Sequence, residues 1–427
     1  MRFVLWLLAI FAAAVGVALF ATQSTGTVTL FWPPHRIDLS LNLVLLLLAA
    51  LFVLLYLALR ALSALVDLPA QAKAWRASQR QIAMHAELRD AMAHLLSGRF
   101  ARAKKQALLA HQHALSLPDE ALQKLHGLEV QSMALLIAAE SAQSLQDAPE
   151  RERLVQASLD VPLPKSAQHF KEGTVLRSAR WMLDEHDPAT SLKRLATLSQ
   201  GAQRRTLALR LKLRALQLAR QPSEALDTAR LLAKHGGFSA QASQSMVRSL
   251  SVSALSEAHD ADQLSRSWNA LTEAEQAQAE IATHAAQRLV NLSAGSPDAL
   301  DLHERARQWI EPVWQRYPQL AESAQIRVVR ALEATFSSDG TSVNHAWLAK
   351  IEAAQRQLPH DTRLQYLAGM ACLHRQLWGK AQQLLSGCAA HLGDEHLKRS
   401  AWRNLAFLAE QRGDAEAALA AWKKAAH

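Results

Sequence analysis

Two long apolar runs stand near the start of the chain. Residues 3–21 contain no polar side chain, and residues 43–59 contain no charged one. At about 1.5 Å per residue, the first run forms a helix of about 28 Å, close to the ~30 Å hydrocarbon core of a bilayer. The pattern predicts a two-helix transmembrane hairpin over residues 1–66. A cleaved signal peptide is the alternative for the first run, although Leu19 fits poorly three residues before a cleavage site at Ala21.

The basic residues near these runs predict an orientation. The segment between them, about 22–42, carries Arg36 beside Asp38, whereas the flank after the second run carries Arg60, Lys73 and Arg76. Because basic flanks stay in the cytoplasm, we expect the short loop to be periplasmic and both termini to be cytoplasmic.

The loop between the two runs has its own pattern. Residues 28–31 favour a β-strand, Pro33 and Pro34 stop it with a bend, and Trp32 suits the lipid headgroup level. We expect an interfacial anchor here, and a contact site for another membrane protein is the alternative.

Beyond residue 67, apolar residues recur at three- and four-residue spacing between short breaks, which predicts amphipathic helices. The clearest unit resembles a tetratricopeptide repeat, in which small residues let two antiparallel helices cross closely and a glycine reverses the chain. We expect its two tryptophans to fill the ends of that contact. Its signature is Trp402, Leu405, Ala406, Gly413, Ala418 and Trp422.

The same frame recurs upstream with less complete signatures. One unit contains Gly369, Trp378 and Ala381, and another contains Ala91, Gly98, Phe100 and Ala103. Weaker units lie near residues 179–196 and 209–229, while residues 246–335 are helical by periodicity without a clean signature. We expect two sub-arrays, 67–236 and 237–427, separated near Gly236-Gly237, with a further break at 337–340 and the clearest repeats at 362–427. Such arrays present a concave surface to partners.

Composition and charge narrow the fold and its partners. With 15 Gly, 13 Pro, 3 Tyr and 10 Phe in 427 residues, turn and strand formers are scarce, so we expect an all-α chain: the membrane hairpin followed by a tetratricopeptide-like α-solenoid. The net charge is +9, of which residues 60–114 supply +6. This distribution predicts a basic patch beside a membrane rather than a nucleic-acid binder. The basic residues from 73 to 105 are either a solvated face or a contact for anionic lipid or an acidic partner.

Candidate chemistry is sparse. The chain lacks GxxxxGK[ST], HExxH and GxSxG, so we predict that it is not an enzyme and has no catalytic residues. Cys372 and His374, with Cys388 and His391, have zinc-like ligand types. In the repeat frame both cysteines occupy packing positions, so we predict no metal and no cofactor, with a haem or porphyrin ligand as the open alternative.

Several residues carry a resemblance to a known family. Gly26, Trp32, Pro33, Pro34, Arg36 and Asp38 form the pattern G-x-V…WPPHRIDLS, and residues 97–105 read SGRFARAKK. With the two apolar runs and the repeats, the chain resembles the proteobacterial HemY family. It does not resemble the flavin-dependent oxidase of the same name, because it lacks the G-x-G-x-x-G motif of a dinucleotide fold.

The resemblance implies an inner-membrane protein associated with a late step of protoheme biosynthesis. We therefore expect a non-catalytic, membrane-anchored scaffold that binds partner proteins, namely haem-biosynthetic enzymes, on its cytoplasmic face. The alternatives are a haem- or porphyrin-binding regulator of the pathway and an enzyme of unrecognised type.

Overall fold

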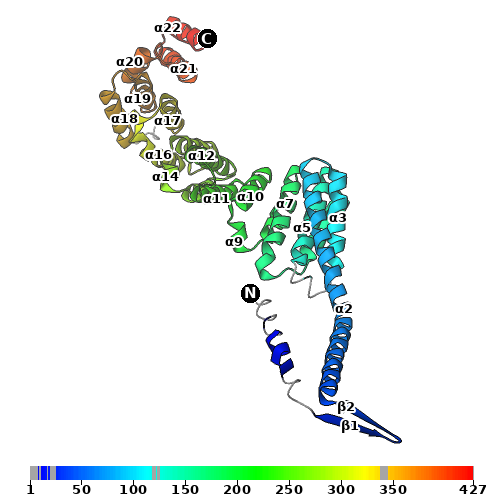
Figure 1. The fold of residues 1–427 in the computed structure, drawn as a ribbon. Coiled ribbons are helices and arrows are strands. Elements are labelled where there is room, and N and C mark those ends of the chain that lie inside the picture. The colour runs from blue at the N-terminus through cyan, green and yellow to red at the C-terminus, as the bar shows by residue number, and fades with distance from the viewer. Residues whose placement is uncertain are drawn as a thin grey trace. The chain divides into compact units, whose positions relative to one another are not determined.

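The computed structural model describes residues 26–117, 126–336 and 345–426, together with Leu8, Leu122 and residues 11–16 and 18–19 (Figure 1). The chain forms two compact units, Met1–Phe170 and Lys171–His427. The boundaries expected at 66/67 and 236/237 differ from this division, because one helix runs through the first of them and helix packing continues across the second.

The first unit begins with a β-hairpin, so the expected all-α class is incomplete. Strands β1 (Thr27–Trp32) and β2 (His35–Ser40) pair antiparallel, with Thr27 opposite Ser40 and Trp32 opposite His35. The expected β-like run at 28–31 lies in β1. The Pro33-Pro34 turn joins the strands, because neither proline can donate a ladder hydrogen bond.

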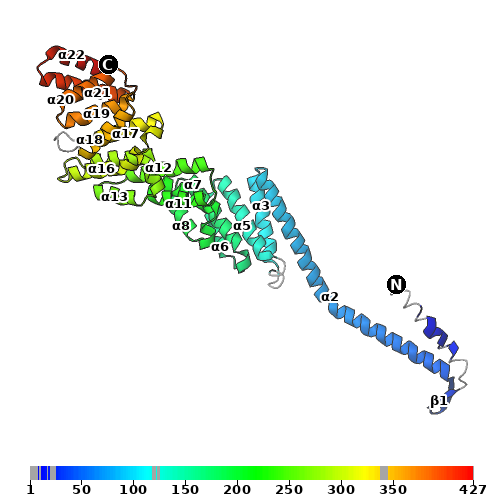
Figure 2. The ribbon, with the colours of Figure 1, turned by 90° about the vertical axis from the view of Figure 1, so that its left-hand side faces the viewer.

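Helix α2 (Leu41–Leu96) follows at once and is 56 residues long. Its first part, Leu41–Ser63, is entirely unburied, and among the described residues it is the one helix long and apolar enough to cross a membrane. The other expected span, 3–21, lies largely outside the described residues. Figure 2 shows α2 continuing from the hairpin to α3, so the apolar segment and the first helix pair share one helix.

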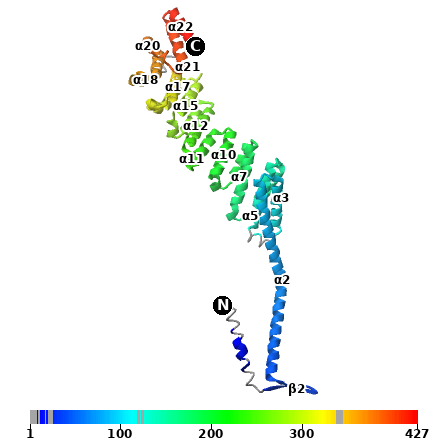
Figure 3. The same cartoon turned by 45° about the horizontal axis from the view of Figure 1, so that its top comes forward.

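Helical pairs make up the rest of both units (Figures 1 and 3). The first unit also contains α3 (Phe100–Leu115), α5 (Gly127–Ser144), α6 (Ala148–Asp160) and η1 (Lys165–Ala167). Helix α7 (Gln168–Asp184) crosses the border between units. The second unit contains α8 (Pro188–Ala196), α9 (Gln200–Gln203), α10 (Thr206–Leu218), α11 (Pro222–Lys234), α12 (Ala240–Ser256), α13 (Ala261–Asn269), α14 (Glu273–Gln276), α15 (Ala279–Leu292), α16 (Ala299–Trp314), η2 (Tyr317–Gln319), α17 (Glu322–Ala334), α18 (His345–Gln357), α19 (Thr362–His374), α20 (Trp378–Cys388), α21 (Glu395–Gln411) and α22 (Ala415–Ala426).

One type of turn joins the two helices of six pairs. A single residue takes the left-handed conformation, with φ between 54° and 75°. The N–H of the next residue donates to the carbonyl five positions earlier at 2.8–3.0 Å, which satisfies the end of the first helix. The left-handed residue is Gly98, Gln146, His186, Arg220, Gln376 or Gly413. Gly236 makes the same turn at the end of α11, with φ of 66° and Gly237 N donating to the Leu232 carbonyl at 2.8 Å, but residues 237–239 separate it from α12. Four of these seven left-handed residues are not glycine, so a search for glycine misses more than half of the turns.

Small residues mark most of the positions where the paired helices cross, as expected for a tetratricopeptide-like array, with Arg151 and Leu213 as the two exceptions. Relative to the left-handed turn residue, the position seven before and the position five after are both buried in all six pairs. In α7 and α8, Ser191 Oγ donates to the Ala179 carbonyl at 2.9 Å, which directly records this close approach. The pairs are Ala91 and Ala103, Ala139 and Arg151, Ala179 and Ser191, Leu213 and Ala225, Gly369 and Ala381, and Ala406 and Ala418.

Residues 246–335 are helical as expected, but aromatic rings do much of the packing there. Trp268 and Trp309 stack with centroids 4.8 Å apart. Trp314 contacts Tyr317 at 5.3 Å and Trp347 at 6.2 Å, and all five rings are buried. Large rings keep helices further apart than alanines do, which explains why this segment lacks the small-residue signature. The break expected at 337–340 lies outside the described residues.

Candidate functional site

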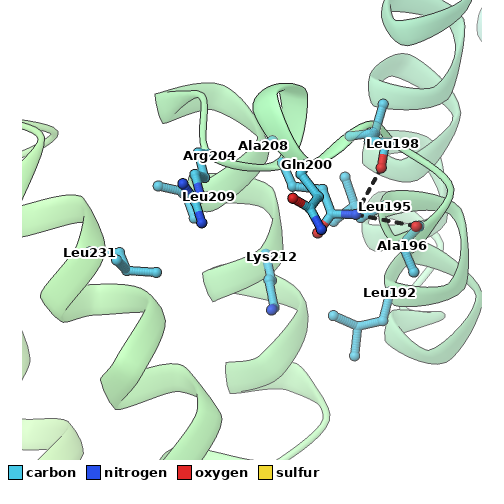
Figure 4. A pocket seen from close by; sticks show the side chains of 11 residues that line it. Leu192, Leu195, Ala196, Leu198, Gln200, Arg204, Ala208, Leu209, Lys212 and Leu231 are labelled. Carbon is cyan, nitrogen blue, oxygen red and sulfur yellow. Dashed lines mark hydrogen bonds between the residues drawn. The ribbon is translucent and has the colours of Figure 1, made fainter.

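The second unit has a hollow of about 340 Å³ among α8, α9, α10 and α11 (Figure 4). Helix α8 places Leu192 and Leu195 on its wall, α10 supplies Leu209, and α11 supplies Leu231. Leu195 and Leu209 also belong to the buried interior, whereas Leu231 stays 44% exposed. The apolar wall therefore extends from the buried interior at Leu195 and Leu209 to the protein surface at Leu231.

Polar side chains line the remainder of this hollow. Gln203 holds the loop in place, because its amide donates to the carbonyls of Ala196 at 3.2 Å and Leu198 at 2.8 Å. Arg204 and Lys212 are exposed and line the hollow. Neither cation has a salt bridge within the described part of the chain. The hollow therefore combines leucine walls with two cations whose charge is uncompensated, which suits an anionic group attached to an apolar body.

The lining of this hollow is mostly apolar or cationic. Its eleven lining residues include no hydroxyl, thiol, imidazole or carboxylate side chain. The Lys212 amine is the one lining group of a type that also serves as a nucleophile or general base in enzymes. We did not predict this hollow from the sequence. The available signal was the run from 192 to 212, where lysine and arginine alternate irregularly with leucine.

A second hollow, of about 400 Å³, lies among α12, α15, η2 and α17. Arg248, Arg316 and Arg327 line it, with Glu280 as its one carboxylate, which pairs with Arg248 at 3.1 Å. Arg316 donates to the Ala277 carbonyl at 2.5 Å, so its charge is not neutralised. These two hollows are therefore net positive.

The predicted repeat residues lie in the helix pairs, and their aromatic side chains differ in how far they are buried. Trp402 is half-buried beneath the Lys424 ammonium, 4.3 Å from its ring centroid, and Trp422 donates to Glu410 at 2.7 Å. Both rings bridge α21 and α22. Trp378 and Trp422 nevertheless remain 46% and 42% exposed, so they fill the contact only in part. Phe100 is half-buried, as is Leu405.

The basic stretch from 73 to 105 does not form one surface. Lys104 pairs with Asp147 at 3.3 Å, and Arg80 donates to the Ser116 carbonyl at 2.6 Å. Arg99 lies beyond the end of α2, about 50 Å of helix past Ser63. Because salt screens charges over about 8 Å, Lys73 and Arg99 are too far apart to attract the same charged group.

Both cysteines pack in the interior, as the repeat frame predicts. Cys372 and Cys388 are fully buried, and burial raises the pKa of the Cys388 thiol to about 12 and also raises that of Cys372. His374 lies against the Phe336 ring at 5.7 Å. Within the described ranges, no three His, Cys, Asp or Glu side chains gather as metal ligands.

A polar cluster joins three helices of the second unit. The Glu333 carboxylate on α17 accepts hydrogen bonds from the Tyr366 hydroxyl on α19 and from Ser400 Oγ on α21, the latter at 3.0 Å. Nearby, Arg330 donates to Asp394 at 2.5 and 2.7 Å. Burial raises the pKa of Glu333 above its ordinary value of 4.5, although these hydrogen bonds oppose the shift.

Glu333→Gln is expected to stabilise the protein at neutral pH. The pKa of Glu333 is higher in the folded state than in the unfolded state. The free energy of unfolding therefore falls as the pH rises from about 4.5 through the folded-state pKa, because the folded protein keeps this proton to a higher pH than the unfolded protein does. Glutamine keeps an acceptor oxygen without the charge. Urea unfolding from pH 4 to 8 should show a variant advantage at pH 7–8 that disappears near pH 4. An equal difference at every pH would contradict this assignment.

The fold and these sites define a class: a tetratricopeptide-like helical array joined to an apolar helix that is compatible with membrane anchoring. Residues 26–146 match the family model described as HemY protein N-terminus, from the β-hairpin through α5. This match confirms, over these residues, the resemblance to the HemY family given by the loop and the SGRFARAKK segment.

Other comparisons add little. No curated protein sequence matches the chain. The Naa15/Naa10 complex bound to HypK-THB is 14% identical over 78% of this chain and 56% of that chain, with a TM-score of 0.24. The P58(IPK) TPR domain is 15% identical over 77% of this chain and 99% of that one, with a TM-score of 0.20. Scores this low carry no argument about function.

Proposed function

We propose that this protein is a non-catalytic scaffold, anchored in a bacterial inner membrane, whose helical array binds partner proteins in the cytoplasm. The anchor is a two-pass hairpin formed by residues 3–21 and Leu41–Ser63. Tethering raises the effective concentration of bound partners at the membrane without any chemistry. Following the family, the partners are enzymes of a late step of protoheme biosynthesis.

The hollow beside Arg204 and Lys212 is the observation that carries this proposal. Its leucine walls and its two cations, which form no salt bridge with any described residue, suit an amphipathic, acidic segment of a partner. The second, arginine-lined hollow extends the same preference for anionic groups along the second unit. A haem- or porphyrin-binding regulator is the alternative, because a flat apolar ligand with carboxylates has similar needs.

Reversing both charges should strongly reduce partner recovery. Crosslinked pull-down from membranes with Arg204→Glu/Lys212→Glu is expected to recover roughly tenfold less of the terminal haem enzymes than the parent chain, since like charges facing each other cost more than about 1.4 kcal/mol. Arg399→Glu/Arg403→Glu, on exposed positions of α21, makes the same charge change and should leave recovery unchanged.

Two results would count against the scaffold. Recovery that is unaffected by the Arg204/Lys212 pair would remove the hollow from partner binding. A sharp Soret shift on haem titration of the purified full chain, lost in the same double variant, would favour the regulator instead.

A further inference from the structure

The β-hairpin before α2 is amphipathic. Val28 pairs with Leu39, and Leu30 pairs with Ile37 across the two strands. Because cross-strand partners share a face and successive residues alternate, these four side chains lie on one face together with Trp32 and its partner His35 at the tip. The opposite face carries Thr27, Thr29, Phe31, Arg36, Asp38 and Ser40.

The apolar face is uncovered in the described structure. Leu30 is 51% exposed, Ile37 is 48% exposed and Trp32 at the tip is 72% exposed. A two-stranded hairpin is marginally stable in water without a surface against which to pack its apolar side. This face therefore needs an apolar neighbour.

The polar face is arranged for water. Arg36 pairs with Asp38 at 3.4 Å, and both side chains are more than half exposed. The Arg36 guanidinium also lies 5.5 Å from the centroid of Phe31, the one aromatic ring on this face. One face of the hairpin is thus suited to water and the other to an apolar surface.

The base of the hairpin is fixed to the first turn of the apolar helix. Leu41 N donates to the Gly26 carbonyl at 2.9 Å, and Leu43 N donates to Ser40 Oγ at 3.3 Å. A Cβ at Gly26 would lie 3.4 Å from Leu41 Cδ2, so this approach leaves little space for a side chain. Figures 1 and 3 show the hairpin projecting sideways from this end of α2.

We propose that this hairpin lies flat on the bilayer surface where α2 enters it, with the apolar face against the acyl–headgroup boundary. The inference rests on the proposed membrane anchoring. The occupant is lipid because the base of the hairpin is hydrogen-bonded to the first turn of Leu41–Ser63, whose own surface is apolar and unburied. Trp32 then lies at the headgroup level, where indole rings are favoured. The hairpin sets the depth of α2 and limits its tilt.

Single-cysteine fluorescence quenching tests this orientation. The full chain with Leu30→Cys, Ile37→Cys or Thr29→Cys, labelled with a bimane probe, is reconstituted in phosphatidylethanolamine–phosphatidylglycerol vesicles. Brominated lipid should quench the labels at 30 and 37 severalfold more than the label at 29, and iodide should show the reverse order. The substituted side chains are exposed, so no cavity is created, and the parent chain, with buried Cys372 and Cys388, reports background labelling.

Each other outcome is decisive. Equal iodide quenching on both faces would place the hairpin in water and overturn the inference. Protection of position 30 from both quenchers in native membranes would mean that a protein covers the face, which also overturns it. A label at Leu51→Cys, within the apolar helix, separates the two proposals: if brominated lipid fails to quench it, the anchoring itself is wrong.

Discussion

Replacing Trp347 by alanine is expected to lower the free energy of unfolding by about 3–5 kcal/mol. The Trp347 ring is 2% exposed and contacts Trp314 edge-on at 6.2 Å. Lys350 Nζ lies 4.9 Å from its centroid and also pairs with Glu311 on α16. Removing the indole leaves a cavity between α16 and α18 and takes away the aromatic partner of Lys350.

The matched control is Trp378→Ala. This ring is 46% exposed at the start of α20, so its truncation removes less buried surface and opens no internal cavity. We expect a loss below about 1 kcal/mol. Urea unfolding of the full chain in detergent micelles, followed by far-ultraviolet circular dichroism, measures both. Equal losses would contradict the packing described for the aromatic segment.

Two glycines within neighbouring helices should respond to alanine with opposite signs. A Cβ at Gly369 on α19 would lie 2.8 Å from Leu385 Cγ and 2.9 Å from its Cδ2, and Leu385 is fully buried. Gly369→Ala is therefore expected to destabilise the protein by about 1–3 kcal/mol through overpacking. At Gly379 on α20 a Cβ meets nothing within 4 Å, so Gly379→Ala should stabilise it by about 0.5–1 kcal/mol.

The same urea titration distinguishes these two variants. Because both substitutions exchange glycine for alanine within a helix, an opposite sign identifies the contact with Leu385 as the cause of the loss. If Gly369→Ala also stabilises the chain, α19 and α20 are not crossing as closely as the structure places them.

Two turns were predictable from sequence because their chemistry is local. Gly98 and Gly413 take φ of 72° and 75°, which glycine adopts without steric cost, and both were singled out by spacing. His186 and Arg220 adopt the same conformation because Asp187 N and Gln221 N complete hydrogen bonds to the preceding helix. The pairing of helices imposes this geometry on ordinary residues, and a single sequence offers no marker for it.

The candidate sites likewise differ in whether their residues are close together in the sequence or far apart. The loop residues Trp32, Arg36 and Asp38 were identified from sequence, because they lie within one short hairpin. The hollow at Arg204 and Lys212 needs Leu231 from a later helix, and the cluster at Glu333 needs partners 33 and 67 residues further along the chain. Periodicity describes one helix at a time and contains no information about such neighbours.

The sequence by itself determined the apolar helix, the amphipathic helices and the small residues at their crossings, because each depends on spacing within one element. Tertiary structure alone decided that α2 continues unbroken from the apolar segment to the first pair, that Lys104 is neutralised while Arg204 is not, and which rings are buried. Those outcomes depend on which distant side chains meet, since burial and charge compensation are properties of neighbours in space.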